Sequence, residues 1–394
     1  MTFFKALSPQ PLDEITRLVA ARKADPRNNV IDLGIGVYRD ETGVCSGFDA
    51  LRRANQLQSV EQEDQGYLTL AGHEGFLREM SSLILGDELT QTLAWQTVGG
   101  TGGVRLALEL TKSAQRSPSL YVGLPTWGNH VAIAKKVGLS VRTHSYHDPK
   151  QQAARFDEIM AAAAATRSGD VFIMHGPCHN PTGIDLMPAE RLEIVRTLNK
   201  QGAIPLIDAA YYGLKDGLEQ DLGQIKAEMS EAEEAMLVVS CSKAFGLYRE
   251  RTGTLFIKTD QATKHAAIQQ TLASHARSAN SSPPSFGARL VTTVLSQSDL
   301  FHIWRAELDA MRLRLQANRV ELTNKLADID VVSRHTNEGA GLFTQVNLNT
   351  HEIAQLAEHA AIYLPESGRI NLSGLNQHNM DIFISAIKAL RNPA

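Results

Sequence analysis

Short apolar runs alternate with amphipathic stretches along the middle of the chain. The runs are rich in β-branched residues, which favours buried strands. They lie at 95–98, 119–127, 139–146, 171–174, 203–207, 236–239 and 254–257. The stretches between them have helical spacing and include 99–114, 128–138, 151–166, 188–201 and 262–276. Strands that alternate with helices predict an α/β fold, with a mostly parallel sheet that helices cover on both faces.

The two ends of the chain are organised differently. Residues 1–12 hold two prolines and predict an extended arm, whereas residues 13–23 predict a helix with acid at its start and base at its end. A long charged helix over 299–326 joins the large domain to a smaller one. Strands of the smaller domain are expected at VVSRHT (331–336), LFTQVNL (342–348), AIYLPE (361–366) and RINLSGL (369–375). We therefore expect an arm at 1–12, a small α+β domain from 13–44 and 311–394, and a large domain at 45–310.

One lysine follows directly on a predicted buried strand, in the segment SCSKAFG at 240–246. Burial of the Lys243 amine lowers its pKa and makes it a nucleophile that forms a Schiff base. Ser240 and Arg251 supply donors that suit a phosphate dianion. Lysine and phosphate site together indicate pyridoxal phosphate. A loop lysine that reaches water is the alternative, and the short pattern does not decide between them.

Polar or aromatic side chains follow three other predicted strands. Trp127, Asn180 and Asp208 stand at strand ends, where open α/β sheets place their ligands, and Tyr211 follows in the turn after Asp208. An indole stacks on a flat heteroaromatic ring, although a tryptophan packed in the core is the other interpretation. The residue before a proline is held extended, which fixes the direction of the Asn180 amide. A carboxylate at a buried strand end needs a charged or donating partner, and a protonated pyridine nitrogen would be one.

Two glycine-rich segments are candidates for close approach of the backbone to a ligand. GGTGG at 99–103 lies between a predicted strand and a predicted helix, an arrangement that points free amides at an anion. It is neither a Walker motif nor GxGxxG. Glycine needed only for tight packing of strand and helix is the alternative, and GIG at 34–36 is equally compatible with a plain turn.

The overall composition narrows the classes of partner. The chain has 394 residues, 43% hydrophobic and 21% charged, with a net charge of −4, so no basic surface for nucleic acid is expected. Three scattered cysteines predict neither disulfides nor a metal site and are typical of a cytoplasmic protein. No signal peptide and no membrane span are expected. A small molecule is therefore the expected partner.

Taken in order, the motifs resemble those of class I aspartate and aromatic amino acid aminotransferases. The resemblance extends from about residue 10 to the end of the chain. It rests on GGTG (99–102), WGNH (127–130), HNPTG (179–183), DAAY (208–211), SCSKAFG (240–246) with Arg251, SSPP (281–284) and SGRINLSGL (367–375). It implies fold type I, with a seven-stranded sheet and a smaller α+β domain. It also implies ping-pong transamination between an aromatic amino acid or aspartate and 2-oxoglutarate, through a lysine aldimine.

The resemblance assigns a role to each cofactor residue. Lys243 is similar to the aldimine lysine that then moves the substrate proton, and Asp208 to the carboxylate that keeps the pyridine nitrogen protonated, with His130 behind it. Asn180 and Tyr211 are similar to the donors to the ring oxygen, and Trp127 to the stacking residue. The phosphate site would be formed by Gly100, Thr101, Ser240 and Arg251, with Tyr67 from the neighbouring subunit of a homodimer.

The same resemblance implies the substrate site. Arg369 is similar to the arginine that holds the substrate α-carboxylate, and Arg277 to the arginine sent across the dimer interface to a side-chain carboxylate. Gly36 and Phe343 lie where the family lines its substrate pocket, and Trp127 and Asn180 also face the substrate. The chain departs from the family pattern at Asn280 and Ala244, at GGTGG and in the segment after Tyr38, which leaves the preferred amino donor open.

Three other functions remain open at this point. A pyridoxal-phosphate lyase or a specialised biosynthetic enzyme would use the same scaffold, although the presence of both Arg277 and Arg369 argues against it. A cofactor-binding regulator would need a DNA-binding segment, and no extra basic helix precedes residue 13. A nucleotide-dependent oxidoreductase built on the glycine segment would leave Lys243 and Asp208 without a role.

Overall fold

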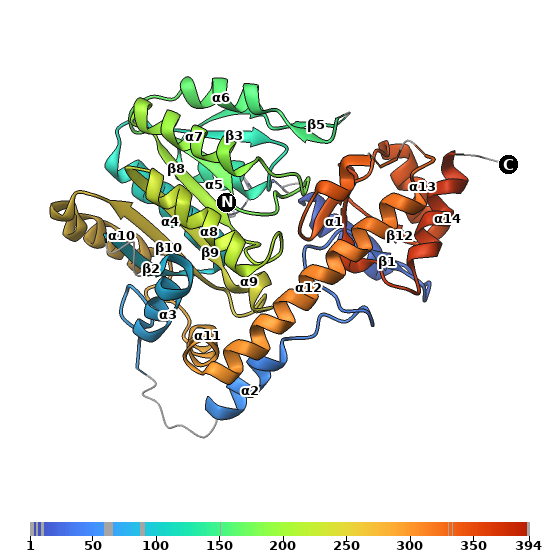
Figure 1. The fold of residues 1–394 in the computed structure, drawn as a ribbon, viewed down its shortest axis with the longest axis horizontal. Helices are drawn as coiled ribbons and strands as arrows, with labels where there is room; N and C mark the ends of the chain where they lie inside the picture. The colour runs from blue at the N-terminus through green and yellow to red at the C-terminus, as the bar shows by residue number, and fades with distance from the viewer. Residues whose placement is uncertain are drawn as a thin grey trace.

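A seven-stranded sheet forms the centre of the larger part of the molecule (Figure 1). The computed structural model describes residues 4, 7–8, 12–58, 66–86, 91–149, 151–329, 331–332 and 334–391. Across the sheet the strands are β2 (Thr92–Val98), β10 (Thr252–Thr259), β9 (Glu234–Ser240), β8 (Ile204–Ala209), β7 (Val171–His175), β3 (Ser119–Leu124) and β4 (Ser140–Ser145). β10 runs antiparallel to both neighbours, and every other pair in this sheet is parallel. The expected mostly parallel seven-stranded sheet is confirmed.

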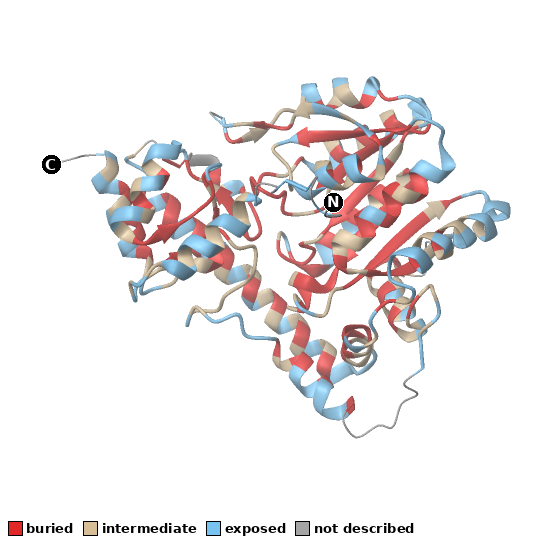
Figure 2. Cartoon of the chain, turned by 180° about the vertical axis from the view of Figure 1, so that it is seen from behind, coloured by how far each residue is buried: buried red, intermediate tan, exposed pale blue. Residues whose placement is uncertain are grey.

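Helices cover both faces of this sheet because its central strands are apolar on both sides. Along β9, Met236 and Val238 pack into one cluster while Leu237 and Val239 pack into the other. The first cluster lies under α4 (Gly99–Ala114), α5 (Asn129–Val137) and α10 (His265–Ala279). The second lies under α3 (Glu74–Leu85), α6 (Phe156–Ala164), α7 (Pro188–Gln201), α8 (Leu218–Glu231) and α11 (Phe286–Ser296). Figure 2 shows the buried strands between exposed helix faces.

The smaller part of the molecule joins the two ends of the chain. β1 (Ile31–Asp32) pairs in parallel with β12 (Ile362–Tyr363), and β11 (Phe343–Gln345) pairs antiparallel with β13 (Arg369–Asn371). Around these pairs lie α1 (Glu14–Ala24), α13 (Thr350–Ala360) and α14 (Met380–Arg391). The long helix α12 (Ser298–Lys325) runs from the large part into the small one (Figure 1). The predicted boundary at residue 311 falls inside this continuous helix and stays a prediction, and most of the predicted arm lies outside the described residues.

Two predicted segments differ from the structure near residues 150 and 280. The prediction of a helix over 151–166 is wrong for its first residues, which belong to a hairpin in which β5 (His147–Asp148) pairs with β6 (Ala153–Ala154). The N–H of Arg155 extends this pairing by bonding the carbonyl of Tyr146. The helix predicted over 262–276 extends further than expected, since α10 continues to Ala279 and α11 begins at Phe286. Arg277 therefore lies on the last turn of a helix.

Other differences concern short or unpredicted elements. The strand predicted at 331–336 is wrong, because residues 334–338 form a 3₁₀ helix and the buried Val331 and Val332 account for the apolar pattern. The glycine-rich segment at 99–103 forms the first turn of α4 rather than a turn before it. The segment after β9 is the one-turn helix α9 (Cys241–Ala244), and α2 (Asp49–Gln58) and α8 were not predicted.

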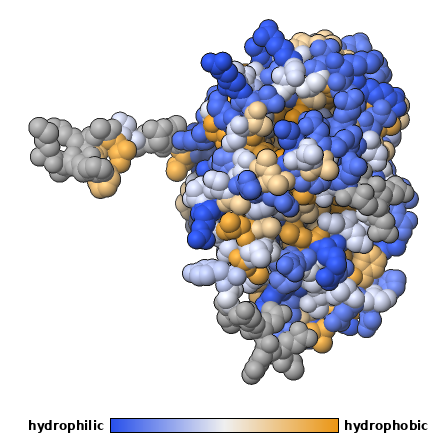
Figure 3. Space-filling model, turned by 90° about the vertical axis from the view of Figure 1, so that its left-hand side faces the viewer, coloured by the Kyte–Doolittle hydropathy of each residue, from blue (hydrophilic) through white to orange (hydrophobic). Residues whose placement is uncertain are grey.

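The outer surface of the molecule is mostly polar on the side shown in Figure 3, where hydrophilic residues surround smaller apolar patches. Within the described ranges, no helix has the length and apolar character needed to span a membrane.

Helix α12 also supports the turn that carries Lys243. Trp304 of α12 is fully buried, and its ring stacks on Phe245 with centroids 4.5 Å apart. Its Nε1–H donates to the carbonyl of Ala244 at 2.7 Å. One side chain thus packs against the segment after Lys243 and satisfies a carbonyl at the end of α9, where helix carbonyls have no partner in the helix.

We expect Trp304→Phe to lower the free energy of unfolding by about 1–3 kcal/mol, because it removes the bond to Ala244 and part of a buried ring. Urea denaturation followed by circular dichroism measures the change. Leu313→Ala on the same helix is the control: Leu313 is 57% exposed, and its loss is expected to cost less than about 0.5 kcal/mol. Equal losses in the two variants would contradict this role of Trp304.

Candidate active site

A cavity lies where the carboxyl ends of β7, β8 and β9 meet the start of α4. Parallel strands bring their carboxyl ends to one edge of a sheet, so residues distant in sequence converge there. The cavity is lined by Gly100, Thr101, Trp127, His175, Asn180, Asp208, Ala210, Tyr211, Ser240, Ser242, Lys243 and Arg251. Nine of the predicted site residues therefore lie together. His175, Ala210 and Ser242 line the same cavity but were not among the predicted site residues.

Lys243 occupies the single turn of α9, directly after β9. Ser240 caps this turn by accepting the N–H of Ser242 at 3.2 Å. The Lys243 Nζ lies 5.2 Å from the centre of the Tyr211 ring and 5.9 Å from that of Tyr248. Burial lowers the pKa of Lys243 to about 8; the charge of Asp208 opposes this shift, and Arg251 and Arg369 add to it. A neutral, nucleophilic amine is therefore accessible near physiological pH.

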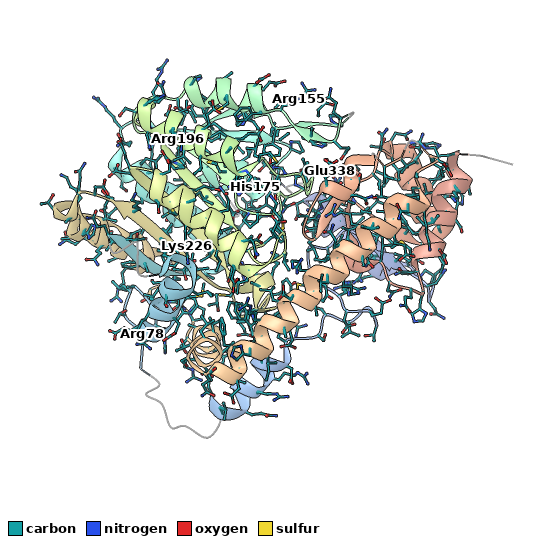
Figure 4. All side chains as sticks on the ribbon, in the orientation of Figure 1. Arg78, Arg155, His175, Arg196, Lys226 and Glu338 are labelled. Atoms are coloured by element: carbon teal, nitrogen blue, oxygen red, sulfur yellow. The ribbon has the colours of Figure 1, made fainter. Side chains whose placement is uncertain are left out.

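Asp208 lies near the end of β8 and is linked to a chain of buried polar groups behind it. Its Oδ2 is 2.9 Å from Nε2 of the fully buried His130. The hydroxyl of Thr126 lies 2.8 Å from the other His130 nitrogen and 2.9 Å from Nε2 of His175. Burial, together with His179 and His130, holds the pKa of His175 well below its usual value. Figure 4 labels His175 within the large part of the molecule and Arg155 nearer its edge.

The start of α4 and the residues around Arg251 form a cradle for an anion. The N–H groups of the first turn of α4 have no partner within the helix. Arg251 directs Nη1 toward the hydroxyl of Ser242 at 3.3 Å and the carbonyl of Tyr248 at 3.4 Å. A Cβ added to Gly99, whose φ is +64°, would lie 2.6 Å from the Arg251 guanidinium. In the described part of the chain Arg251 has no carboxylate partner, so these donors fit a phosphate group.

The opposite side of the cavity suits a flat ring. Trp127 is half-buried and meets the edge of His130, with ring centres 5.2 Å apart. The Oδ1 of the buried Asn180 has no hydrogen-bond partner among the described residues. Burial raises the pKa of Tyr211, so its hydroxyl stays protonated and remains a donor. An aromatic group with polar substituents would provide these side chains with the contacts they lack.

Arg369 opens β13 and lies beside this ring site. Its guanidinium stacks over the ring of Phe343, 4.4 Å from the ring centre, and Nη2 donates to the carbonyl of Gly34 at 2.6 Å. A Cβ on Gly36 would lie 3.0 Å from the Phe343 ring, so the loop passes close to it. The Nε of Arg369 has no partner among the described residues, and burial lowers the pKa of this arginine. An incoming carboxylate would supply what the guanidinium lacks.

The structure does not bring two of the predicted residues to the cavity of their own chain. Tyr67 is 95% exposed. Arg277 is exposed as well, and its Nη1 contacts the hydroxyl of Ser281 at 3.2 Å. Neither residue lines the cavity.

The residues that sequence reasoning missed carried faint signals. Thr126 and His175 stand at the carboxyl ends of β3 and β7, the position that made Trp127 and Asp208 candidates. Ser242 lies in the same segment as Lys243, SCSKAFG at 240–246. No group of three or more histidine, cysteine or acidic residues suited to hold a metal exists among the described residues.

The sequence and the fold are similar to those of known aminotransferases. The family Aminotransferase class I and II matches residues 28–387. An aromatic-amino-acid aminotransferase of Paracoccus denitrificans is 40% identical, over 97% of this chain and 98% of the relative. An aspartate aminotransferase of Haemophilus influenzae is 32% identical, over 98% of this chain and 99% of the relative. The crystal structure of the aromatic-amino-acid aminotransferase from Burkholderia pseudomallei, covalently bound to pyridoxal phosphate, superposes with a TM-score of 0.95 at 30% identity over the whole of both chains. The chain belongs to the class I and II aminotransferases.

Proposed function

We propose that this enzyme transfers the amino group of an aromatic amino acid or aspartate to 2-oxoglutarate in a ping-pong cycle. That it is an aminotransferase acting on amino and oxo acids follows from its family. The choice of donors and of 2-oxoglutarate is supported by its relatives, which include aromatic-amino-acid and aspartate aminotransferases. The observation that carries the proposal is the Lys243 amine, with a lowered pKa, in one cavity with Asp208 and an anion cradle.

Pyridoxal phosphate is the cofactor, and the cavity fits its three parts. The cradle of Gly100, Thr101, Ser240 and Arg251 suits the phosphate, Trp127 the ring face, and Asn180 with Tyr211 the ring oxygen. Lys243 provides the amine for covalent attachment. When bound, the cofactor supplies an electron sink for the bonds of the substrate α-carbon.

Lys243 and Asp208 would carry the proton chemistry. A lysine with a pKa of about 8 is divided between its neutral and charged forms near that pH, which suits a group that first takes a proton and then returns it. Asp208 presents a carboxylate that holds a ring N–H, and His130 behind it fixes its orientation at 2.9 Å. The rings of Tyr211 and Tyr248 lie beside the amine and restrict where the proton is delivered.

Arg369 would bind the substrate α-carboxylate. Its planar fork matches a carboxylate with two parallel hydrogen bonds, and its contact with Phe343 sets the plane of that fork. A carboxylate held there is fixed in orientation, and this fixes the direction in which the attached α-carbon faces Lys243. Such orientation accounts for a large share of the rate enhancement in sites of this kind.

We infer a homodimer in which Tyr67 and Arg277 complete the partner's cavity. Both side chains are exposed, and the arginine that lines the cavity of their own chain among the described residues, Arg251, is assigned to the phosphate. A cytoplasmic location is part of the same proposal and is supported by three free cysteines.

The function is tested with aspartate, phenylalanine and tyrosine as donors and 2-oxoglutarate as acceptor. We expect turnover with at least one of these donors. Lys243→Ala is expected to lose turnover and covalent attachment of the cofactor, because no other lysine among the described residues lines the cavity. Lys136→Ala, which removes an exposed lysine of α5, serves as control and is expected to match the native enzyme. An active Lys243→Ala variant would refute the proposal.

The pKa of Lys243 predicts how fast the cofactor-free enzyme takes up pyridoxal phosphate. Because only the neutral amine attacks an aldehyde, the rate is expected to rise with pH around a midpoint of about 8 rather than 10.5. Asp208 raises this pKa, so Asp208→Asn is expected to move the midpoint lower still. Absorbance of the bound cofactor follows the reaction. A midpoint near 10.5 would show that the amine is solvated.

Sharing of active sites is tested with two variants that are each expected to turn over aspartate poorly or not at all. Arg277→Leu is expected to lower kcat/KM for aspartate about 100-fold and to change that for phenylalanine little, because only aspartate presents a second carboxylate. Mixing Arg277→Leu with Lys243→Ala under conditions that exchange subunits is expected to restore turnover of aspartate, since one hybrid site then has both groups. Absence of any recovery after verified exchange would exclude a shared site.

A further inference from the structure

Arg319 of α12 is a buried cation whose role is not explained by the chemistry above. Only 1% of its surface is exposed, and in the described part of the chain it has no carboxylate partner. Its Nη2 donates to the carbonyls of Gly341 at 3.1 Å and Phe343 at 2.9 Å, while Nη1 has no partner among the described residues. Burial lowers the pKa of this arginine to about 10. A buried charge of this kind is costly unless its contacts compensate for the lost hydration.

The guanidinium lies where three segments of the chain meet. α12 contributes Arg319, the turn after β7 contributes Gly183, and the third segment runs from Gly339 to Phe343. The N–H of Ala340 donates to the carbonyl of Gly183 at 2.8 Å. A Cβ on Gly183, whose φ is +72°, would lie 2.4 Å from the carbonyl oxygen of Phe343 and 3.2 Å from Nη2 of Arg319. Gly183 thus packs directly against the carbonyl of Phe343, where no side chain would fit. Arg319 bonds that same carbonyl, so the position of Arg319 determines that of the Phe343 backbone.

Phe343 in turn contacts two groups of the cavity. Its ring supports the guanidinium of Arg369 at 4.4 Å and meets the edge of Tyr211 with centres 6.1 Å apart. The Gly183 side of the junction belongs to the turn that carries Asn180. Arg319 therefore contacts, through backbone, both the ring side and the carboxylate side of the site.

We propose that Arg319 is a positioning residue that fixes Phe343 and thereby the plane of the Arg369 guanidinium. The proposal rests on the proposed role of Arg369 in binding the substrate carboxylate. It extends that role to a residue that touches neither substrate nor cofactor. Both carbonyls accept from Nη2, whose position the rigid planar guanidinium fixes, whereas a lysine side chain is shorter and ends in a freely rotating ammonium.

Arg319→Lys is expected to raise KM for the amino donor about tenfold and to change kcat by less than about threefold. The reason is that a misplaced Arg369 guanidinium weakens substrate binding more than it affects the chemical step. A readout independent of turnover is the affinity of the holoenzyme for 3-phenylpropionate, a carboxylate that lacks an amino group, measured by calorimetry. We expect about tenfold weaker binding. Cofactor absorbance is expected to stay unchanged.

Arg191→Lys is the matched control. Arg191 is 5% exposed, and its guanidinium bonds Glu228 on α8 rather than the Phe343 segment. Both variants replace a buried guanidinium and are expected to lower the melting temperature, but only Arg319→Lys is expected to weaken carboxylate binding. If the two variants bind 3-phenylpropionate equally, the inference is overturned whatever their stabilities.

A second variant covers the case in which Arg319→Lys does not fold. Gly339→Ala keeps the arginine, but its Cβ would lie 2.9 Å from Nη1 of Arg319 and push the guanidinium aside. Gly339→Ala is expected to weaken 3-phenylpropionate binding as Arg319→Lys does, and native affinity would count against the proposal.

Arg369→Lys, measured in parallel, tests the carboxylate site itself. If it binds as tightly as the native enzyme, the proposed role of Arg369 fails and the inference falls with it.

Discussion

The active site depends on keeping one amine out of water. Lys243 has a pKa near 8 because protein surrounds it, and the opposing charge of Asp208 keeps that shift from going further. The burial comes from the fold: a strand covered on both faces delivers the lysine, and Tyr211 and Tyr248 close around it. A lysine on an ordinary surface loop would be charged at neutral pH and would neither attack an aldehyde nor accept a proton. The other groups of the cavity direct this single reactive atom.

Helix α12 connects that amine with the substrate side. At one end Trp304 packs against Phe245 and bonds Ala244, next to Lys243. Further along, Arg319 holds the segment of Phe343, beside Arg369. Because a helix is stiff over this length, the two anchor points keep a defined separation. The large and small parts of the molecule are thus joined by an element whose buried residues face both halves of the site.

Much of this arrangement follows from local sequence, and the remainder depends on tertiary contacts. The central strands of the sheet were predictable because each is an apolar run, and the roles at their ends because parallel strands share an edge. The helix over 151–166 was misjudged because alanine content favours a helix, whereas the hairpin there depends on a bond between Arg155 and Tyr146. Thr126 and His175 were missed because their importance comes from a contact between two different strand ends. Arg319 gave no signal, since a charged residue on a long helix is usually exposed.

The hydroxyl of Thr126 imposes a direction on the groups behind Asp208. As a carboxylate, Asp208 only accepts, so Nε2 of His130 carries the hydrogen between them, and in the neutral imidazole Nδ1 is then bare. The single hydrogen of Thr126 then points to that bare nitrogen, which leaves its oxygen free to receive a hydrogen from Nε2 of His175. Both imidazoles then carry their hydrogen on Nε2, so one hydroxyl orients the two rings behind the carboxylate.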